Sequence, residues 1–434
     1  MLDSEQQRII DKTRARDGIY TYIGPPGAGK TWLASALALL KVHEGARRVL
    51  LAAYPNRAAD EFGYALPRLT DPTLARSMAV RTGYLPRISA TLPIDQSNNY
   101  SRIVDSRIVV STCMSLKHLR DMRFDHVILD EGGITRLEHL LMPMKFGVNP
   151  GTSPRTPPVF DGTGADLVGF LESLGIQATV LGDPKQSRPI SPRFHERSGI
   201  EMTMRKGYDT LHLTHRMAQD LARLVNDFAR YGGLDSTEEA RYRRLILAEA
   251  PSPGLQPVLN PDDTITMVHV SRGGDEPADL LSTTNRTVAS AVLRICRELV
   301  RVTRNRSILV MTVYGSQRDL IEEMFARAGI SNIPVVTTAG GVGVQADVVV
   351  VALARNNPEY YMGKEGDLPE LNVAISRARE KLIIIGNINM LRNGLATLPT
   401  ASRSPWRSSS RELGWLLDHR YGRVIDAPLE LTTS

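Results

Sequence analysis

A short apolar run followed at once by a glycine-rich loop constrains this chain more than any other feature. Residues 19–23 read IYTYI, which is typical of a buried strand, and residues 24–31 read GPPGAGKT. The loop matches the pattern G-x-x-x-x-G-K-[ST], and the apolar residues 32–40 predict a buried helix after it. This order predicts a phosphate-binding loop, because glycines let successive backbone N–H groups converge on phosphate oxygens at a helix N-terminus.

We expect the whole loop to contact a nucleotide. Lys30 can reach the β- and γ-phosphates, and the hydroxyl of Thr31 can bind Mg²⁺, so the predicted ligands are ATP and Mg²⁺. The alternative is a glycine-rich turn that only matches the pattern, and the flanking strand and helix argue against it. The predicted nucleotide-binding residues of the loop are Gly24, Pro25, Pro26, Gly27, Ala28, Gly29, Lys30 and Thr31.

Composition narrows the class of protein further. A chain of 434 residues predicts two or three domains, and a net charge of +6 suits a polyanionic partner. The two cysteines, Cys113 and Cys296, are far apart in sequence, which argues against a zinc module and predicts a reducing, intracellular compartment such as the cytoplasm. No apolar run approaches the ~18 residues of a membrane span, so we expect no membrane insertion.

Strands alternate with helical stretches in two successive sets, which predicts parallel sheets covered on both faces. A polar helix is expected over residues 2–16. The first set of strands is predicted at 19–23, 49–53, 107–111, 126–131 and 178–183, with irregular chain at 67–99 and a Pro/Gly-rich insertion at about 142–164. The second set is predicted at 211–214, 264–270, 307–313, 334–338, 347–353 and 381–385, with helices at 287–302 and 316–328.

We therefore predict an α/β protein with two tandem nucleotide-binding-type domains and a short tail. The first domain covers residues 1–208 and the second covers residues 209–400. Residues 401–434 begin with a Ser/Arg-rich linker and contain a short helix near 414–421.

Two acids end a predicted strand and supply the groups that a phosphate loop needs. Asp130 would hold Mg²⁺, and Glu131 would orient or deprotonate an attacking water. Gln186 follows the end of another predicted strand, where its amide could contact both the γ-phosphate and that water; the alternative is an N-cap or turn residue. Arg216 and Arg377 are candidates to neutralise charge on the transferred phosphoryl group, yet spacing alone does not distinguish them from other arginines.

The ordered set of motifs resembles superfamily 1 helicases, most closely the 5′-to-3′ branch that contains the nonsense-mediated-decay helicase and RNA-virus helicases. The resemblance covers about residues 2–391. The motifs that carry it are Gln6, GPPGAGKT, AYPNRAAD (53–60), STC (111–113), DEGG (130–133), GDPKQSRP (182–189), LTHRM (213–217), NRT (285–287), TVYGSQR (312–318) and LNVAISRAR (371–379).

This resemblance implies two RecA-like domains with parallel sheets and a role for each motif residue. Gln6 would read adenine, His215 would stack on the base, and Arg216 and Arg377 would be arginine fingers. Single-stranded RNA or DNA would be the partner, and RNA is favoured because the most similar motifs belong to RNA-acting members. The residues implied to hold the strand are Asn56, Thr112, Thr312 and Tyr314. Tyr314 could stack on a base or simply pack in the core.

Departures from the family pattern bear on nucleotide selectivity and coupling. The family motif Q-G-x-E corresponds to residues 342–345, so that Val342 replaces the glutamine and Gln345 replaces the acid that holds the ribose. Gly343 and Gln345 are still expected at the nucleotide. After the acidic pair, Gly132 and Gly133 replace the more usual alanine and serine or threonine.

Three rival functions stay open at this point. A P-loop kinase or another NTPase without motor activity would not require the LTHRM and LNVAISRAR motifs. A nucleic-acid-binding scaffold with a decayed motor would account for Val342 and Gln345. A DNA helicase of the same superfamily would share every motif with an RNA helicase.

Overall fold

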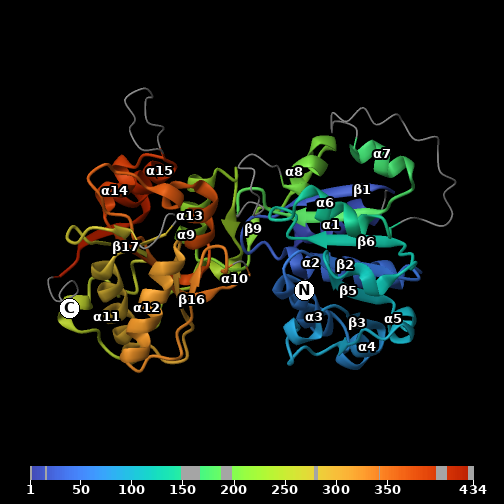
Figure 1. Cartoon of the computed structure of the whole chain (residues 1–434), viewed down its shortest axis with the longest axis horizontal. Coiled ribbons are helices and arrows are strands. Elements are labelled where there is room, and N and C mark those ends of the chain that lie inside the picture. Colours follow the sequence, from blue (N-terminus) through green and yellow to red (C-terminus); the bar gives the residue numbers. More distant parts are fainter. Residues whose placement is uncertain are drawn as a thin grey trace. The chain divides into compact units, whose positions relative to one another are not determined.

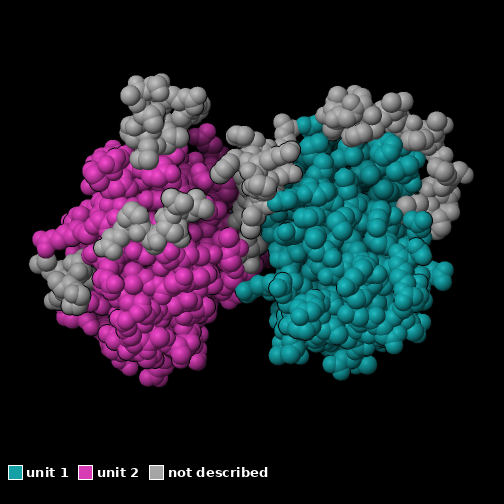
Figure 2. Space-filling model, in the orientation of Figure 1, with its two compact units in different colours: residues 1–184, 188–212 teal, residues 185–187, 213–434 magenta. Residues whose placement is uncertain are grey.

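The chain folds into two α/β units, each built around its own parallel sheet. The computed structural model describes residues 2–14, 17–147, 167–186, 198–277, 282–341, 343–396 and 408–428. The first unit contains residues 1–184 and 188–212, and the second contains residues 185–187 and 213–434 (Figure 2). This arrangement confirms the predicted α/β fold class with parallel sheets.

The first sheet has eight strands in the order β4-β3-β5-β2-β6-β7-β1-β8, and all its pairs are parallel (Figure 1). Its strands are β1 (Ile19–Ile23), β2 (Val49–Ala53), β3 (Ala79–Arg81), β4 (Asp95–Gln96), β5 (Ile108–Thr112), β6 (His126–Asp130), β7 (Ala178–Gly182) and β8 (Asp209–Thr210). The helices of this unit are α1 (Ser4–Arg14), α2 (Lys30–His43), α3 (Asn56–Leu69), α4 (Pro72–Met78), η1 (Leu85–Arg87), α5 (Tyr100–Asp105), η2 (Leu116–Leu119), α6 (Leu137–Met144), α7 (Leu167–Ser173), α8 (Gly199–Thr203) and η3 (Met204–Lys206).

Helices cover both faces of this sheet because successive strand residues point to opposite sides. In β2, Leu51 packs in a cluster with apolar residues of α1, α2 and α3, whereas Leu50 packs in a second cluster with residues of α6 and α7. A strand buried on both faces needs a continuous apolar sequence, which is what residues 49–53 provide.

Two predictions for this unit were wrong in part. Residues 67–99 are not irregular, since they contain α4, β3, η1 and β4, and β3 pairs with β5. The strands β3 and β4 are only three and two residues long, so neither shows a recognisable pattern. The predicted Pro/Gly-rich insertion begins inside α6, which continues to Met144, and its residues 148–164 lie outside the described part.

The second sheet has six parallel strands in the order β15-β14-β16-β17-β11-β18. Its strands are β11 (Ile265–His269), β14 (Ile308–Thr312), β15 (Val335–Thr337), β16 (Ala346–Ala352), β17 (Ala378–Gly386) and β18 (Arg423–Asp426), and two small pairs join β9 (Leu213–Thr214) to β10 (Asp235–Ser236) and β12 (Glu276–Pro277) to β13 (Thr283–Thr284). Its helices are α9 (Gln219–Ala229), α10 (Glu238–Arg241), η4 (Pro253–Leu255), α11 (Arg286–Val302), α12 (Gly315–Arg327), η5 (Gly363–Gly366), α13 (Leu368–Ile375), α14 (Ile388–Asn393), α15 (Ser410–Leu416) and the π-helix η6 (Leu417–Tyr421). Residues of α11 and α12 cover one face, and those of α9, α13, α14 and α15 cover the other.

The chain differs from the prediction near both ends of the second unit. The predicted boundary follows residue 208, but β8 pairs with β1 of the first sheet and the division between units falls after His212. Of the predicted strand 211–214, only Leu213–Thr214 is extended, and it pairs with β10 rather than joining the six-stranded sheet. The tail is more than a linker and a helix, because β18 pairs with β11 at the sheet edge. The part of the Ser/Arg-rich stretch before residue 408 lies outside the described residues.

Candidate functional site

The phosphate loop lies between the carboxyl end of β1 and the first turn of α2, as predicted. Gly27 and Gly29 have φ values of 77° and 72°, and this left-handed backbone is accessible to glycine without steric cost. The N–H of Gly24 donates to the carbonyl of Gly182 at the end of the adjacent β7, at 3.0 Å. The loop therefore leaves the sheet at its carboxyl edge, where ligands bind in open α/β sheets.

The side chains of the loop converge with the acid that ends β6. Thr31 Oγ1 donates to Asp130 Oδ2 at 2.7 Å, and Lys30 Nζ donates to the Gly24 carbonyl, also at 2.7 Å. A Cβ at Gly24 would lie 2.6 Å from Lys30 Cγ, so the absence of a side chain there makes room for the lysine stem. Hydroxyl and carboxylate oxygens at this separation suit Mg²⁺, which prefers oxygen ligands.

Glu131 follows Asp130 in a strained conformation. Its φ of 57° is left-handed, which costs a residue with a Cβ about 1 kcal/mol or more. Two contacts hold it there: its N–H donates to Asp130 Oδ1 at 2.8 Å, and its carbonyl accepts from Thr135 Oγ1 at 2.8 Å. Backbone strain of this kind concentrates at functional sites.

Close packing explains why glycine occupies the two positions after the acidic pair. A Cβ on Gly133 would lie 2.8 Å from the carbonyl carbon of Asp183, and one on Gly132 would lie 3.2 Å from the Leu181 carbonyl oxygen. The N–H of Gly132 also donates to that oxygen at 2.9 Å. This departure from the family pattern is therefore tied to the close packing of the chain after β6 against the end of β7.

Gln6 contacts the phosphate loop from α1. Its side chain is 1% exposed, and Nε2 donates to the carbonyl of Ala28 at 3.2 Å. Its own N–H donates to Asp3 Oδ1 at 2.8 Å, which anchors the first turn of the helix. The structure thus brings Gln6 to the loop, while its role in reading adenine stays a prediction.

In the second unit, the arginines and the glutamines predicted as site residues form hydrogen-bonded pairs. Arg377 is 3% exposed, and its Nη2 donates to Gln186 Oε1 at 2.7 Å. Arg216 donates from Nε to Gln345 Oε1 and from Nη1 to the carbonyl of Ser376, each at 2.9 Å. Arg216 therefore contacts both the ribose-motif position and the residue preceding Arg377.

Two further predicted nucleotide residues flank these pairs. His215 precedes Arg216 and its carbonyl accepts from Arg243 Nη1 at 2.9 Å. Gly343 has a φ of 80°, a backbone conformation that favours glycine. Val342 lies outside the described residues. The predicted contacts of these residues with base and ribose stay predictions.

The four predicted strand-binding residues differ in how they are exposed. Asn56 is half-buried at the start of α3, and Thr112 is 3% exposed at the end of β5. Thr312, at the end of β14, is fully buried, and its hydroxyl has no hydrogen-bond partner among the described residues. Tyr314 is 3% exposed, so the structure supports the packing alternative for this ring over stacking on a base.

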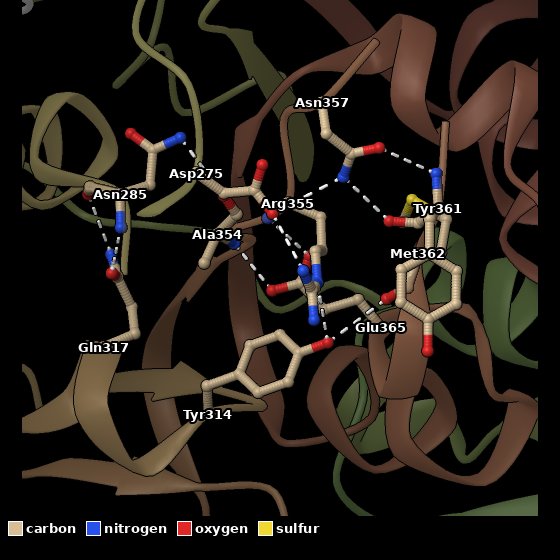
Figure 3. Close-up of polar contacts among 10 residues, drawn as sticks. All are labelled: Asp275, Asn285, Tyr314, Gln317, Ala354, Arg355, Asn357, Tyr361, Met362 and Glu365. Atoms are coloured by element: carbon tan, nitrogen blue, oxygen red, sulfur yellow. Dashed lines mark hydrogen bonds and ion pairs between the residues drawn. The ribbon is translucent and has the colours of Figure 1, made fainter. Parts of the chain in front are cut away.

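A polar network that sequence reasoning missed encloses Tyr314 (Figure 3). Arg355 Nε donates to Tyr314 Oη at 3.0 Å, and Arg355 Nη1 pairs with Asp275 Oδ2 at 3.0 Å. The guanidinium lies 5.1 Å from the Tyr314 ring centroid and 5.3 Å from that of Tyr361, which are cation–π distances. The signal in the sequence is Arg355 itself, three residues after the end of the buried β16.

A buried carboxylate completes this network. Both oxygens of Glu365 accept backbone N–H groups, from Ala354 at 2.6 Å and Arg355 at 2.9 Å. Burial raises the pKa of Glu365 to about 7, against the lowering effect of those two donors. Glu365 thus fixes the chain that leaves β16, and Asn285, through hydrogen bonds with Gln317 and Ala354, fixes the start of α11 beside it (Figure 3).

Comparison with known proteins supports one family. A family model described as an AAA domain matches residues 195–389. Over 418 residues the chain is 25% identical to the DNA replication ATP-dependent helicase/nuclease DNA2 of Saccharomyces cerevisiae, covering 89% of this chain and 26% of that protein. It is 24% identical over 424 residues to the RNA helicase Mov10l1 of Mus musculus, covering 86% of this chain and 33% of that protein. These matches support a superfamily 1 helicase.

The matches bear out the resemblance to superfamily 1 helicases that was inferred from the motifs. The chain spans about a quarter to a third of the length of these two relatives. Among solved structures, "The structure of PRRSV helicase" aligns with a TM-score of 0.46 and 15% identity, covering 92% of this chain and 58% of that one. Within the described residues, no helix combines the length and the apolar character needed to cross a bilayer.

Proposed function

We propose that this superfamily 1 chain hydrolyses ATP to move along single-stranded nucleic acid. The observation that carries the proposal is the 2.7 Å contact between Thr31 of the phosphate loop and Asp130 at the end of β6. It joins a phosphate-binding loop to a second-strand acid, the pairing that P-loop NTPases use to hold nucleotide and metal. The names of the relatives support nucleic acid as the track.

The residues of the first unit fit the chemistry of hydrolysis. Thr31 and Asp130 would hold Mg²⁺, which when bound neutralises charge on the phosphate oxygens. Lys30 binds the β- and γ-phosphates, and Glu131 accepts a proton from the water whose oxygen attacks the γ-phosphorus. The bond to the bridging oxygen breaks, so that the products are ADP and inorganic phosphate.

The second unit supplies positive charge and a sensor. Arg216 and Arg377 would stabilise the charge that develops on the equatorial oxygens, and Gln186 would report whether the γ-phosphate is present. The hydrogen bond between Arg377 and Gln186 supports a joint role for these two residues. Because the arginines gain the γ-phosphate as an anionic partner only with ATP, binding and hydrolysis would shift the population between two conformational states of the chain.

We propose RNA as the preferred strand and 5′-to-3′ as the direction, on the strength of the motif resemblance. The relatives include a protein named as a DNA helicase/nuclease and one named as an RNA helicase, so DNA is the second candidate track. A cytoplasmic location stays a prediction from cysteine usage.

A steady-state ATPase assay with poly(U), with oligo(dT) and without polymer tests the proposal. We expect at least one polymer to stimulate turnover, and Lys30→Ala to abolish it because the phosphate loses its cation. Turnover without stimulation would favour an NTPase without motor activity, and strand binding without turnover would favour a decayed scaffold. Unwinding of 5′- and 3′-tailed RNA and DNA duplexes would then determine the substrate and the direction.

A further inference from the structure

A fully buried arginine of the first unit lies beside one of the predicted strand-binding residues. Arg81 ends β3 and is 0% exposed, which is exceptional for an arginine without partners. Three of its nitrogens have acceptors: Nε donates to Asp60 Oδ1 at 2.9 Å, Nη1 to the Thr82 carbonyl at 2.5 Å, and Nη2 to Asn56 Oδ1 at 3.1 Å. The ion pair with Asp60 explains how the charge is tolerated inside the unit.

The spacing of its two side-chain partners suits one guanidinium. Asn56 is the first residue of α3 and Asp60 is four residues later, so the two side chains share one face of the helix. The planar fork of Arg81 spans both. Asp60 is itself fixed, because Oδ2 accepts from the N–H of Ser89 at 3.0 Å.

The chain that follows Arg81 is held as firmly. Asn98 Oδ1 accepts from Thr82 Oγ1 at 2.8 Å and from the N–H of Gly83 at 3.0 Å, and Asn98 Nδ2 donates to the Gly83 carbonyl at 2.7 Å. Gly83 has a φ of 146°, a region that favours glycine. These bonds fix the carbonyl of Thr82 that accepts from Arg81.

The contact determines which way the amide of Asn56 points. A guanidinium only donates hydrogen bonds, so the atom of Asn56 that faces it must be the oxygen. The nitrogen Nδ2 therefore faces away from Arg81, and no acceptor for it is found in the described part of the chain. An outward N–H₂ group is a donor, which is what a phosphate or sugar oxygen of a nucleic acid requires.

We infer that Arg81 is a positioning residue that holds the Asn56 amide with its N–H₂ group towards the nucleic-acid strand. This inference rests on the proposed function, because it assigns a partner to Asn56. Arg81 itself contacts no strand and has no part in ATP hydrolysis. The segment 67–99 thus takes part in strand binding through β3, although it lies outside the motifs quoted above.

A double-mutant cycle separates positioning from general stabilisation. In Arg81→Lys the single ammonium group will remain with the charged Asp60, so Asn56 loses its donor. We expect Arg81→Lys and Asn56→Ala each to weaken binding of fluorescein-labelled oligo(U) and oligo(dT) about five- to tenfold. In the Asn56→Ala background, Arg81→Lys should change affinity less than twofold, because the group it positions is already gone.

Arg48→Lys is the matched control for replacing a hydrogen-bonded guanidinium group by an ammonium group. Arg48 donates from Nε and Nη2 to the Val104 carbonyl at 3.1 and 2.7 Å, and it precedes β2 at the amino edge of the sheet, whereas Asn56 follows β2 at the carboxyl edge. We expect it to lower the melting temperature without weakening strand binding. Equal losses of affinity from Arg81→Lys in both backgrounds, or no loss at all, would overturn the inference.

A second variant keeps the test informative if Arg81→Lys does not fold. Asn56→Asp puts a carboxylate beside the guanidinium, so it should melt at a higher temperature than Asn56→Ala and yet bind the strand more weakly, because an acceptor replaces the outward donor. Binding of Asn56→Asp as tight as that of Asn56→Ala would refute the amide orientation. If the wild-type chain binds neither polymer, the proposed function fails first and independently of Arg81.

Discussion

Replacing Gly133 by alanine tests whether packing requires the double glycine that follows the acidic pair. A Cβ at Gly133 would lie 2.8 Å from the carbonyl carbon of Asp183 and 3.3 Å from its backbone nitrogen. Ordinary van der Waals contact begins near 3.4 Å, and the Asp183 carbonyl oxygen would lie closer to this Cβ than the carbonyl carbon does, so one of the two backbones must move by more than about 0.6 Å. The Cβ position is fixed by the backbone of residue 133, and the atoms it would meet are backbone atoms of Asp183, so no change of side-chain rotamer can relieve the overlap.

The expected cost follows from two opposing terms. Overpacking of this kind lowers the free energy of unfolding by about 1–3 kcal/mol. Alanine also restricts the unfolded chain, which raises the free energy of unfolding by up to about 1 kcal/mol. Because main chain must move, the overpacking cost here is about 2–3 kcal/mol, and the net loss of roughly 1–3 kcal/mol lowers the melting temperature of a unit of this size by about 2–12 °C. Because Glu131 is only two residues away, we also expect kcat for ATP hydrolysis to fall at least about tenfold.

Thermal unfolding followed by circular dichroism, together with polymer-stimulated ATPase turnover, measures both effects. The control is Gly315→Ala, where a Cβ would meet no atom within 4 Å and the melting temperature should stay the same or rise. If Gly133→Ala melts and turns over like the wild type, the chain after β6 has room for a side chain and the steric argument is refuted.

Two further predictions concern the second unit. Burial raises the pKa of Glu365 to about 7, above its ordinary value of 4.5. As the pH rises, the unfolded chain therefore loses this proton before the folded chain does. The contribution of Glu365 to the free energy of unfolding should fall by roughly 3 kcal/mol between about pH 4.5 and 7. Urea unfolding of Glu365→Gln over this range should lack that decline, and an unchanged pH dependence would contradict the shift. In Gln345→Glu a charge-assisted bond would hold Arg216, which now donates to the Gln345 amide at 2.9 Å, so kcat of ATP hydrolysis should fall about two- to fivefold. A lower KM for ATP with unchanged kcat would instead assign the introduced carboxylate to the ribose.

The sequence predicted the central strands well because their burial is visible in it. Residues 49–53 and 127–129 are apolar runs bounded by polar chain, and the structure has β2 and β6 around them. Three short strands at or next to a sheet edge were missed. β3, β4 and β18 have only three, two and four residues, and their register depends on the neighbouring strand rather than on their own residues.

The site residues divide in the same way. Lys30, Thr31 and Asp130 were predicted because their roles fix both residue type and position, and the structure brings all three together. Tyr314 was left between two interpretations, and only tertiary contacts with Arg355 favour packing. No sequence pattern around Tyr314 could have shown this contact, because Arg355 is 41 residues away.

The residues that support the site could not be predicted from the sequence, for a physical reason. In sequence, Arg81, Arg355 and Glu365 are charged residues, and charged residues are almost always solvated. Arg81 and Glu365 are instead fully buried and Arg355 is half-buried, because each has a partner outside its own element. The partner is Asp60 for Arg81, Asp275 for Arg355, and the backbone after β16 for Glu365. A sequence motif identifies residues that contact a ligand. A buried charged residue, by contrast, identifies residues that hold the ligand-contacting residues in place. Buried charges beside motif residues are therefore where a structure adds most to the interpretation of a helicase sequence.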